Sequence, residues 1–321
     1  MTRAKSSLLA EDLSNLDALL ARMRAGERRA ISRAVTELER LSASAPRLLR
    51  AMEPYLGNAL VLGFTGPPGA GKSTLVNAYT RHLRQAGTTI GIIAVDPSSP
   101  VSGGAILGDR IRMTATLDDD GVFMRSLASR GHLGGLCPAA VRVIDALDAA
   151  GKDVILIETV GTGQSEIDVA EVADVRVLVT APGLGDDIQA MKAGLIEIAD
   201  VMVVNKADRE GAARTVQQLK GALALRPREL GEVPVLETIA TTGAGIDELA
   251  AAVDEVARRR LAEGPRQRRR RRARYLIARA AAERIARRVK DGGGAVLDQL
   301  ADDVLSGRLA PEAAAERLFS A

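Results

Sequence analysis

The stretch "GPPGAGKST", residues Gly66–Thr74, decides the fold. It matches the pattern G-x-x-x-x-G-K-[ST], and it stands between the aliphatic run "ALVLGFT" and the helix-forming "LVNAYTRHL". Its glycines let successive backbone N–H groups converge on phosphate oxygens, and the following helix adds its positive amino-terminal end. Lys72 can then reach the β- and γ-phosphates while Ser73 offers a hydroxyl to Mg²⁺. A Gly/Pro turn that imitates the pattern would not need this strand–loop–helix order, so we predict a nucleoside triphosphate site.

Short aliphatic runs alternate with helical stretches on both sides of this loop. The runs are "ALVLGFTG", "TIGIIAVD", "VILIE", "VRVLVT", "VMVVN" and "VPVLET". Runs that are apolar throughout are typical of parallel strands covered by helices on both faces. We therefore predict an α/β P-loop NTPase fold with a doubly wound, mostly parallel sheet. Ligands of such sheets bind beyond the carboxyl ends of the strands, where Gly66, Asp96, Glu158, Asn205 and Thr238 fall.

The flanking regions differ from this core and define three segments. Residues 1–58 have helical spacing of apolar residues, with Gly26 between two candidate helices, and we predict an N-terminal helical extension. Residues 59–262 form the predicted nucleotide-binding domain. Residues 263–321 are predicted to be a C-terminal helical arm, in which "DGGG" at 291–294 precedes two short helices.

Composition excludes several classes of protein. The single cysteine, Cys137, excludes an internal disulfide framework, and with only two histidines there is no Cys/His cluster for zinc or nickel. No apolar stretch is long enough to span a membrane, and the N-terminus has no apolar signal core. We expect a cytoplasmic protein.

The net charge of +3 hides a strongly basic segment. Residues 256–290 carry +13, so the rest of the chain carries −10. We expect the run Arg268–Arg272 to be a solvated basic stretch. Nucleic-acid binding is a weaker alternative because only Tyr275 is present for base stacking.

The segment "NKAD", Asn205–Asp208, follows the strand "VMVVN" and predicts the base that is bound. Asp208 can accept hydrogen bonds from N1–H and the exocyclic amine of guanine, whereas adenine presents an acceptor at N1. Such a mismatch leaves the carboxylate unpaired and should cost several kcal/mol. An N-K-x-D that merely caps a helix would not require "TIATTGAG" (Thr238–Gly245) after the next strand. We therefore predict GTP rather than ATP.

Three acids compete for the metal: Asp96 in "VDPSSP", Asp109 in "GDRIRM" and Glu158 in "LIETVGTGQSE". Mg²⁺ takes six oxygens and keeps several waters, so not all three bind it directly. Glu158 ends a Walker-B-type strand and is predicted to sense Mg²⁺. Gly161 can place its N–H near the γ-phosphate. A surface acid at a strand end is the alternative for Glu158, and the glycines that follow it count against that.

On these residues the chain resembles the MeaB/ArgK family, GTPases that chaperone the adenosylcobalamin-dependent methylmalonyl-CoA mutase. The resemblance runs from about residue 26 to beyond 260. It rests on six stretches in order: "GPPGAGKST", "DPSSPVSGGAILGDRIRM", "SRGHLGGL", "ETVGTGQSE", "GLGDDIQAMKAG" and "NKAD".

The resemblance implies roles for individual residues. The phosphate and base contacts would come from Gly66, Pro67, Pro68, Gly69, Ala70, Gly71, Lys72, Ser73, Thr74, Asn205, Lys206, Asp208, Ile239, Ala240 and Thr241. Ser73, Asp96, Asp109 and Glu158 would form the magnesium shell, with Lys72 and Glu158 also catalytic. Gln164 would position water, although it equally suits the start of a helix.

The same resemblance implies how nucleotide state reaches a partner. Gly185–Gly194 would be an additional switch, with Asp186 and Lys192 acting in partner-stimulated hydrolysis. This chain has Ala190 and Ala193 where some relatives have Gly and a second basic residue, which puts the strength of that response in question. The implied partner is an acyl-CoA mutase, with a cobalamin adenosyltransferase as a further candidate. The C-terminal arm would form a homodimer through an apolar stripe: Tyr275, Leu276, Ile277, Ile285 and Val289.

Two other functions stay open at this point. A metallocentre-maturation GTPase would need soft or imidazole ligands, which this chain supplies poorly. A small-molecule kinase or transport ATPase would need an acceptor pocket and tolerance of ATP, and Asp208 argues against the second requirement.

Overall fold

The computed structural model describes residues 15–40, 42–96, 119–128, 138–159, 165–184, 193–226, 231–290 and 294–320. The chain divides into two compact units, Met1–Arg271 and Arg272–Ala321. Helix α11 (Pro265–Lys290) begins in the first unit and continues into the second.

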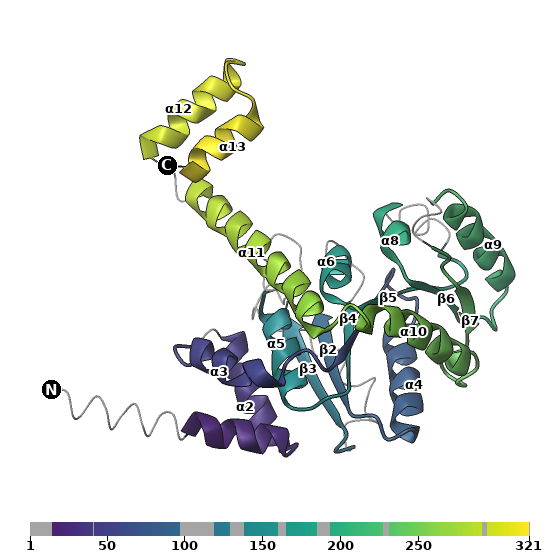
Figure 1. Ribbon diagram of the computed structural model, residues 1–321. Coiled ribbons are helices and arrows are strands. Elements are labelled where there is room, and N and C mark those ends of the chain that lie inside the picture. Colours follow the sequence, from purple (N-terminus) through teal and green to yellow (C-terminus); the bar gives the residue numbers. More distant parts are fainter. Residues whose placement is uncertain are drawn as a thin grey trace. The chain divides into compact units, whose positions relative to one another are not determined.

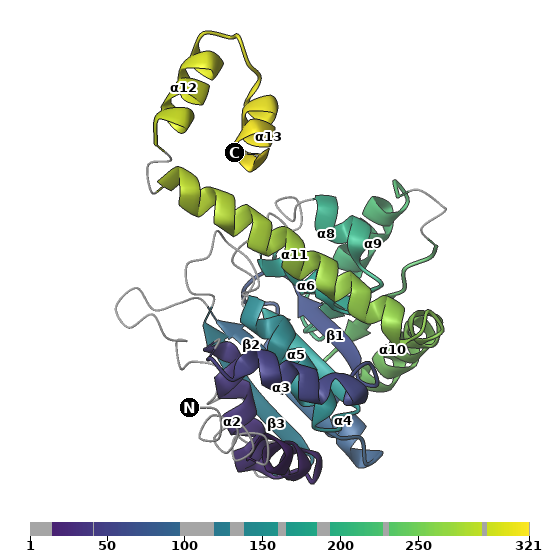
Figure 2. The ribbon, with the colours of Figure 1, turned by 60° about the vertical axis from the view of Figure 1, so that its left-hand side comes forward.

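The first unit is built around one seven-stranded sheet whose strands run in the order β3-β2-β4-β1-β5-β6-β7 (Figures 1 and 2). Every pairing between these strands is parallel. The prediction of a doubly wound α/β fold is confirmed. The strands are β1 (Leu60–Thr65), β2 (Ile90–Asp96), β3 (Val122–Ala128), β4 (Val154–Thr159), β5 (Val175–Thr180), β6 (Val201–Asn205) and β7 (Val235–Thr238).

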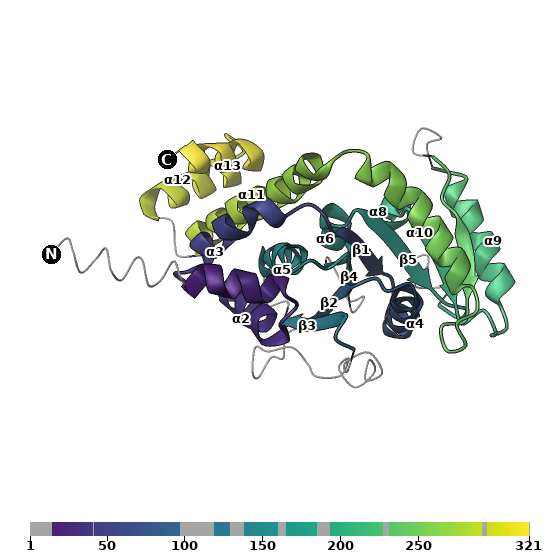
Figure 3. The same ribbon diagram turned by 60° about the horizontal axis from the view of Figure 1, so that its bottom comes forward.

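Helices cover both faces of the sheet, which explains why its central strands are apolar throughout. Helices α4 and α10 pack on one face, while α5, α6, α8 and α9 pack on the other; Figure 3 shows α4 and α5 on opposite sides. Their bounds are α4 (Lys72–Gln85), α5 (Pro138–Ala149), α6 (Ser165–Val172), α8 (Ala193–Ile198), α9 (Ala212–Leu223) and α10 (Ile246–Leu261). Alternation along a strand divides its side chains between these layers. In β6, Val203 joins the core beneath α4 and α10, and Met202 joins the core beneath α9.

The β3 strand was not among the aliphatic runs in the sequence. It lies at the edge of the sheet and pairs only with β2 among the described strands. Its sequence "VFMRSLA" includes Arg125, which donates to Glu39 at 2.5 Å. A strand at the edge of a sheet tolerates a charged residue that is paired in this way, and the pattern of β3 is therefore less apolar than that of a central strand.

The N-terminal extension packs on α5 as a set of short helices (Figure 2). A helix over residues 15–24 precedes α2 (Arg28–Glu39), α3 (Ala45–Met52) and a 3-10 turn at Glu53–Tyr55. Gly26 adopts a φ of +81° between the first two helices. The apolar residues whose spacing predicted the N-terminal helices are buried: Ile31, Val35 and Leu38 are each at most 1% exposed.

The prediction of a solvated basic run is wrong for Arg268 and Arg272, both of which are buried. The Arg268 side chain is only 4% exposed, and its Nη1 lies 3.1 Å from Oδ2 of the fully buried Asp174. The guanidinium also donates to the carbonyl oxygens of Ala59 and Gly57 at 3.1 and 2.5 Å. Arg271 adds a second ion pair to Asp174 at 2.9 Å. The start of α11 thus supplies cations that neutralise a buried acid directly before β5, and this acid also accepts from the N–H of Val61 in β1.

The second unit contains the rest of α11 together with α12 (Gly294–Leu305) and α13 (Pro311–Ser320), which pack on each other. Arg288 donates from Nη1 to the Leu318 carbonyl oxygen at 3.3 Å. Of the predicted dimer stripe, Ile277 is 70% exposed and Val289 44%. Within the described ranges, no helix combines the length and the apolar character needed to cross a membrane.

Candidate nucleotide-binding site

The phosphate loop joins the carboxyl end of β1 to the start of α4, at the centre of the sheet. β1 lies between β4 and β5, so the chain reverses its direction of winding there, and such points are where α/β sheets bind ligands. Gly66 has a φ of +139°, and a Cβ atom on it would overlap the carbonyl oxygen of Val179 in β5. Glycine is therefore required where this loop leaves the sheet.

Lys72 is fixed inside the loop rather than extended into solvent. The residue is only 5% exposed, and its Nζ donates to the carbonyl oxygens of Gly66 and Pro67 at 2.7 and 2.9 Å. The ammonium group is thereby held next to the backbone that would cradle a triphosphate. Of the other predicted phosphate contacts, Pro68, Gly69 and Thr74 are exposed.

Ser73 and Glu158 come together at the start of α4. Ser73 Oγ donates to Glu158 Oε1 at 2.5 Å, and both residues are buried. A serine hydroxyl and a carboxylate are oxygen ligands of the kind that Mg²⁺ takes. Asp96 ends β2, and β2 pairs in parallel with β4, which carries Glu158. The backbone of Asp96 therefore lies at the carboxyl ends of the strands, as Glu158 does. These residues fit a magnesium ion in the chemistry of their donor atoms.

Asn205 joins the phosphate loop to the loop that follows β7. Its Nδ2 donates to the carbonyl oxygen of Ala70 at 2.9 Å, and its Oδ1 accepts from the backbone N–H of Ala240 at 3.1 Å. Thr238, its partner in the β6–β7 register, donates to the same Oδ1 at 3.2 Å. Asn205 is 2% exposed. One carboxamide therefore ties together two predicted contact segments that are far apart in the chain.

Lys206 and Asp208 follow on the exposed side of this junction. Lys206 adopts a φ of +58°, and its Nζ donates to the Gly69 carbonyl oxygen at 2.6 Å. Asp208 is exposed at the head of the next turn, which the N–H of Ala207 anchors to the Thr238 carbonyl oxygen at 3.1 Å. Its carboxylate is thus open to a ligand while its backbone is fixed.

The loop after β7 is a compact turn. The N–H of Ile239 donates to the Ala244 carbonyl oxygen at 2.9 Å, and the N–H groups of Thr242 and Gly243 return to the Ile239 carbonyl oxygen. Ala240 is buried, Ile239 is half-buried and Thr241 is exposed. This turn and Asp208 approach the P-loop from the same side because Asn205 holds them there.

Three threonines at the strand ends were not singled out in the sequence. Thr65, Thr159 and Thr180 end β1, β4 and β5, and all three are buried. Their hydroxyls have no hydrogen-bond partner among the described residues. Buried hydroxyls normally have a partner, so these groups mark the strand ends as places where water or a ligand can bind. The only signal in the sequence is their position as the last residue of each strand.

Several predicted site residues lie outside the described residues. They are Asp109, Gln164, Asp186 and Lys192, together with Gly161 and most of the segment Gly185–Gly194. Their assignments stay predictions.

Comparisons with known proteins give the family of the chain. The family model described as methylmalonyl Co-A mutase-associated GTPase MeaB matches residues 29–293. A sequence-predicted GTPase of Pyrococcus abyssi is 52% identical over 244 residues, covering 75% of each chain. GTPase ArgK of Escherichia coli is 42% identical over 243 residues, covering 73% of each chain. The crystal structure of a LAO/AO transport system kinase is similar with a TM-score of 0.74 at 29% identity, covering 96% of this chain and 97% of that one. The chain therefore belongs to the MeaB family of methylmalonyl Co-A mutase-associated GTPases.

Proposed function

We propose that this chain binds GTP with Mg²⁺, hydrolyses it, and uses its nucleotide state to gate adenosylcobalamin loading, protection or exchange on an acyl-CoA mutase such as methylmalonyl-CoA mutase. The family to which the chain belongs supports the GTPase assignment, and the description of that family supports the mutase as partner.

The observation that carries the proposal is the double attachment of Asn205 to Ala70 of the phosphate loop and to Ala240 of the loop after β7. A nucleotide bound in the P-loop would have its base beside the second loop and beside Asp208. The buried side chain that joins the two loops supports a site in which the phosphate and base contacts would be held together for one ligand. Preorganisation of this kind lowers the entropic cost of binding.

The residues divide the chemistry between them. Backbone N–H groups of the loop and Lys72 would bind the β- and γ-phosphates and neutralise charge that develops during transfer. Ser73 and Glu158, with Asp96 and Asp109, would hold Mg²⁺, which supplies further charge neutralisation to the phosphates when bound. Gln164 would orient the attacking water. Phosphoryl transfer needs mainly positioning and electrostatic stabilisation, so these groups suffice for slow hydrolysis.

A partner would then accelerate the reaction. Asp186 and Lys192 are the residues of the additional switch that we propose respond to the mutase. Completing a phosphoryl-transfer site with one missing cation is worth roughly 10³–10⁵-fold in rate in other GTPases. Slow turnover alone would keep the GTP-bound form available until the mutase is engaged.

We also propose that residues 263–321 contribute to a homodimer and that a cobalamin adenosyltransferase can join the complex. The exposed apolar side chains Ile277 and Val289 support the first of these proposals. Sedimentation analysis of the full chain beside an Ile277→Lys variant tests it. A wild-type chain that sediments as a monomer would exclude the dimer.

The base preference is tested with Asp208→Asn. An asparagine can keep only one of the two hydrogen bonds that the carboxylate accepts from guanine. Losing a charge-assisted hydrogen bond should weaken GTP binding by about 10- to 100-fold, because such bonds are worth about 1.5–3 kcal/mol. ATP binding should hardly change. Titration calorimetry with both nucleotides measures this, and Glu210→Gln, at an exposed acid two residues away, is the control. If the variant keeps the wild-type preference for GTP, Asp208 does not select the base.

The mutase partnership is tested by co-purification with candidate cobalamin-dependent mutases in the presence of GDP or a non-hydrolysable GTP analogue. The proposal expects the amount of bound mutase to depend on the nucleotide. Binding that ignores the nucleotide would exclude gating even if GTP hydrolysis is observed.

One observation favours a second candidate, a small-molecule kinase: the similar crystal structure is titled as a transport system kinase. Hydrolysis of GTP labelled in its γ-phosphate, in the presence of candidate acceptors, separates the two. Label that appears only in inorganic phosphate supports the GTPase, and label on any other molecule supports the kinase.

A further inference from the structure

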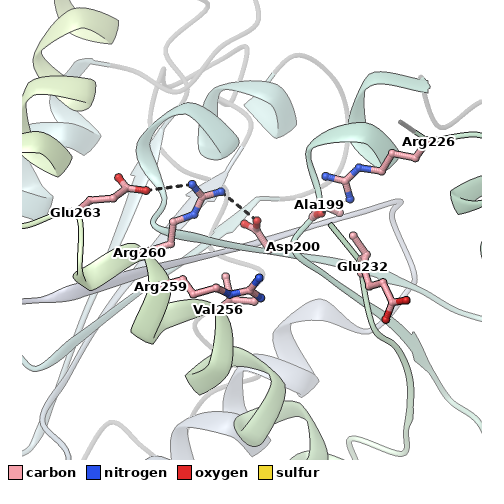
Figure 4. A pocket seen from close by; sticks show the side chains of 9 residues that line it. Ala199, Asp200, Arg226, Glu232, Val256, Arg259, Arg260 and Glu263 are labelled. Atoms are coloured by element: carbon pink, nitrogen blue, oxygen red, sulfur yellow. Dashed lines mark hydrogen bonds and ion pairs between the residues drawn. The ribbon is translucent and has the colours of Figure 1, made fainter. Parts of the chain in front are cut away.

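A cavity lies where the chain enters β6 and β7, at the amino ends of these strands, whereas the P-loop follows the carboxyl end of β1. Figure 4 shows the side chains that line it. Its volume is about 220 Å³. Asp200 comes directly before β6, Arg226 follows α9, and Arg259 and Arg260 belong to the last turn of α10. Glu263 and Glu232 complete its charged lining.

Two of the acids are already neutralised by other arginines. Asp200 accepts from Arg176 Nε and Nη2 at 2.7 and 3.0 Å and from Arg260 at 3.3 Å. Glu263 accepts from Arg260 at 3.3 Å and from Arg271 at 3.4 Å. The dashed lines in Figure 4 show Arg260 between these two carboxylates. The charges of Asp200 and Glu263 are thus balanced without Arg226 and Arg259.

Arg226 has no carboxylate partner within ion-pair distance in the described part of the chain. Its Nη1 donates to the carbonyl oxygen of Ala199 at 3.2 Å, whereas its Nε is buried and has no hydrogen-bond partner among the described residues. Burial lowers the pKa of its guanidinium, and although Asp200 opposes this shift, the neighbouring charge of Arg176 adds to it. A guanidinium stays charged even so. The site therefore contains a partly desolvated cation with an unused donor.

Arg259 adds a second cation to the same lining. It is exposed, and no ion pair to it occurs within the described ranges. Glu232 is the remaining acid of the lining, and Figure 4 shows its carboxylate directed away from the guanidinium of Arg226. Two arginines that have no acid partner among the described residues thus line one cavity.

We propose that this cavity binds a small oxyanion, that is, the phosphate group or the carboxylate of a small molecule, between Arg226 and Arg259. A guanidinium matches both groups because its planar array of N–H donors fits two oxygens at once. The volume lies below the range of roughly 300–1,000 Å³ that is typical of pockets for larger ligands, so the site suits one anionic group rather than a nucleotide. This site is independent of the proposed GTP hydrolysis, because it lies at the amino ends of the strands and the P-loop follows a carboxyl end.

The alternative is a cluster of surface ion pairs that binds nothing, and binding measurements separate the two. The full chain is saturated with GDP and Mg²⁺, so that the P-loop is filled, and titrated calorimetrically with inorganic phosphate and with malonate at constant ionic strength. Sodium chloride is the reference for non-specific screening. The proposal expects saturable binding of at least one of the two anions.

Three variants locate the binding. Arg226→Gln and Arg259→Gln should each weaken it by about tenfold or more, since each removes charge-assisted hydrogen bonds. Arg214→Gln, at an exposed position on α9, removes the same charge and should leave it unchanged. Because Arg259 is exposed, its variant keeps the test valid if Arg226→Gln disturbs folding. A response to phosphate alone assigns the site to phosphate groups, and a response to malonate alone assigns it to carboxylates. The proposal is overturned if neither anion binds beyond the chloride reference, or if both variants bind like the wild type.

Discussion

The joint between the two halves of the nucleotide site can be tested with Asn205→Ala. The substitution removes the carboxamide that donates to Ala70 and accepts from Ala240, at 2.9 and 3.1 Å. Both partners are buried backbone groups that would be left without it. Each buried group left unsatisfied costs about 1–3 kcal/mol, so the two together correspond to about 2–6 kcal/mol. This cost is shared between the free energy of unfolding and the free energy of nucleotide binding.

We expect the Kd for GTP to rise at least about tenfold, which corresponds to 1.4 kcal/mol. The ratio of GTP to ATP affinity should stay near that of the wild type, because Asp208 is unchanged. Titration calorimetry gives both affinities, and urea unfolding of the nucleotide-free protein gives the stability. Asn58→Ala is the control, since its Nδ2 donates to the Tyr55 carbonyl oxygen at an exposed site. Unchanged GTP affinity in Asn205→Ala would refute the claim that this side chain organises the site.

Three further substitutions test the packing around the sheet. Gly66→Ala should abolish nucleotide binding or prevent folding, because its Cβ would overlap the β5 backbone. Gly69→Ala has open space around its Cβ and should lower the free energy of unfolding by only about 1–2 kcal/mol, because of its positive φ. Urea unfolding and nucleotide titration compare the two variants. Arg268→Met should lower the free energy of unfolding by about 3 kcal/mol by breaking a buried ion pair, while exposed Arg270→Met should not, and equal effects would contradict this. Burial lowers the pKa of Lys152 in the folded protein. At pH values between this lowered pKa and the ordinary pKa of lysine, the unfolded chain binds more protons than the folded chain, so the free energy of unfolding rises with pH in that window. Lys152→Met should therefore flatten the rise of unfolding free energy from neutral to alkaline pH, and an unchanged slope in urea unfolding would exclude this role.

The sequence predicted the sheet well because its central strands are buried on both faces. Each of the six aliphatic runs contains a strand, and the loop at Gly66–Thr74 connects β1 to α4 as expected. The strand β3 was missed because it lies at the edge and carries the polar residues Arg125 and Ser126. Position at the edge alone does not hide a strand, because β7 lies at the other edge of the sheet and was predicted from its run.

The sequence predicted which segments meet at the carboxyl ends of the strands, but it did not predict the contacts between them. Asn205 was expected to contact the nucleotide, and its bonds to two loops emerge only when the fold brings β6, β7 and the P-loop together. Arg268 lies in a run of arginines that looks uniformly solvated, and nothing local distinguishes it. Its partner Asp174 is distant in sequence, so its burial depends on tertiary contacts that composition does not encode. The same holds for Arg226, because its lack of an ion pair within the described ranges is a property of the folded arrangement.

The attachment of α11 to the amino end of β1 bears on how the nucleotide domain can be produced alone. A fragment covering residues 59–262 would lack Arg268 and Arg271, and the buried carboxylate of Asp174 would lose both of these ion pairs. It would also lose Gly57, whose carbonyl oxygen Arg268 binds. A truncated version intended for crystallisation or binding studies should therefore retain the first turns of α11 and end no earlier than Arg271, where the first compact unit ends.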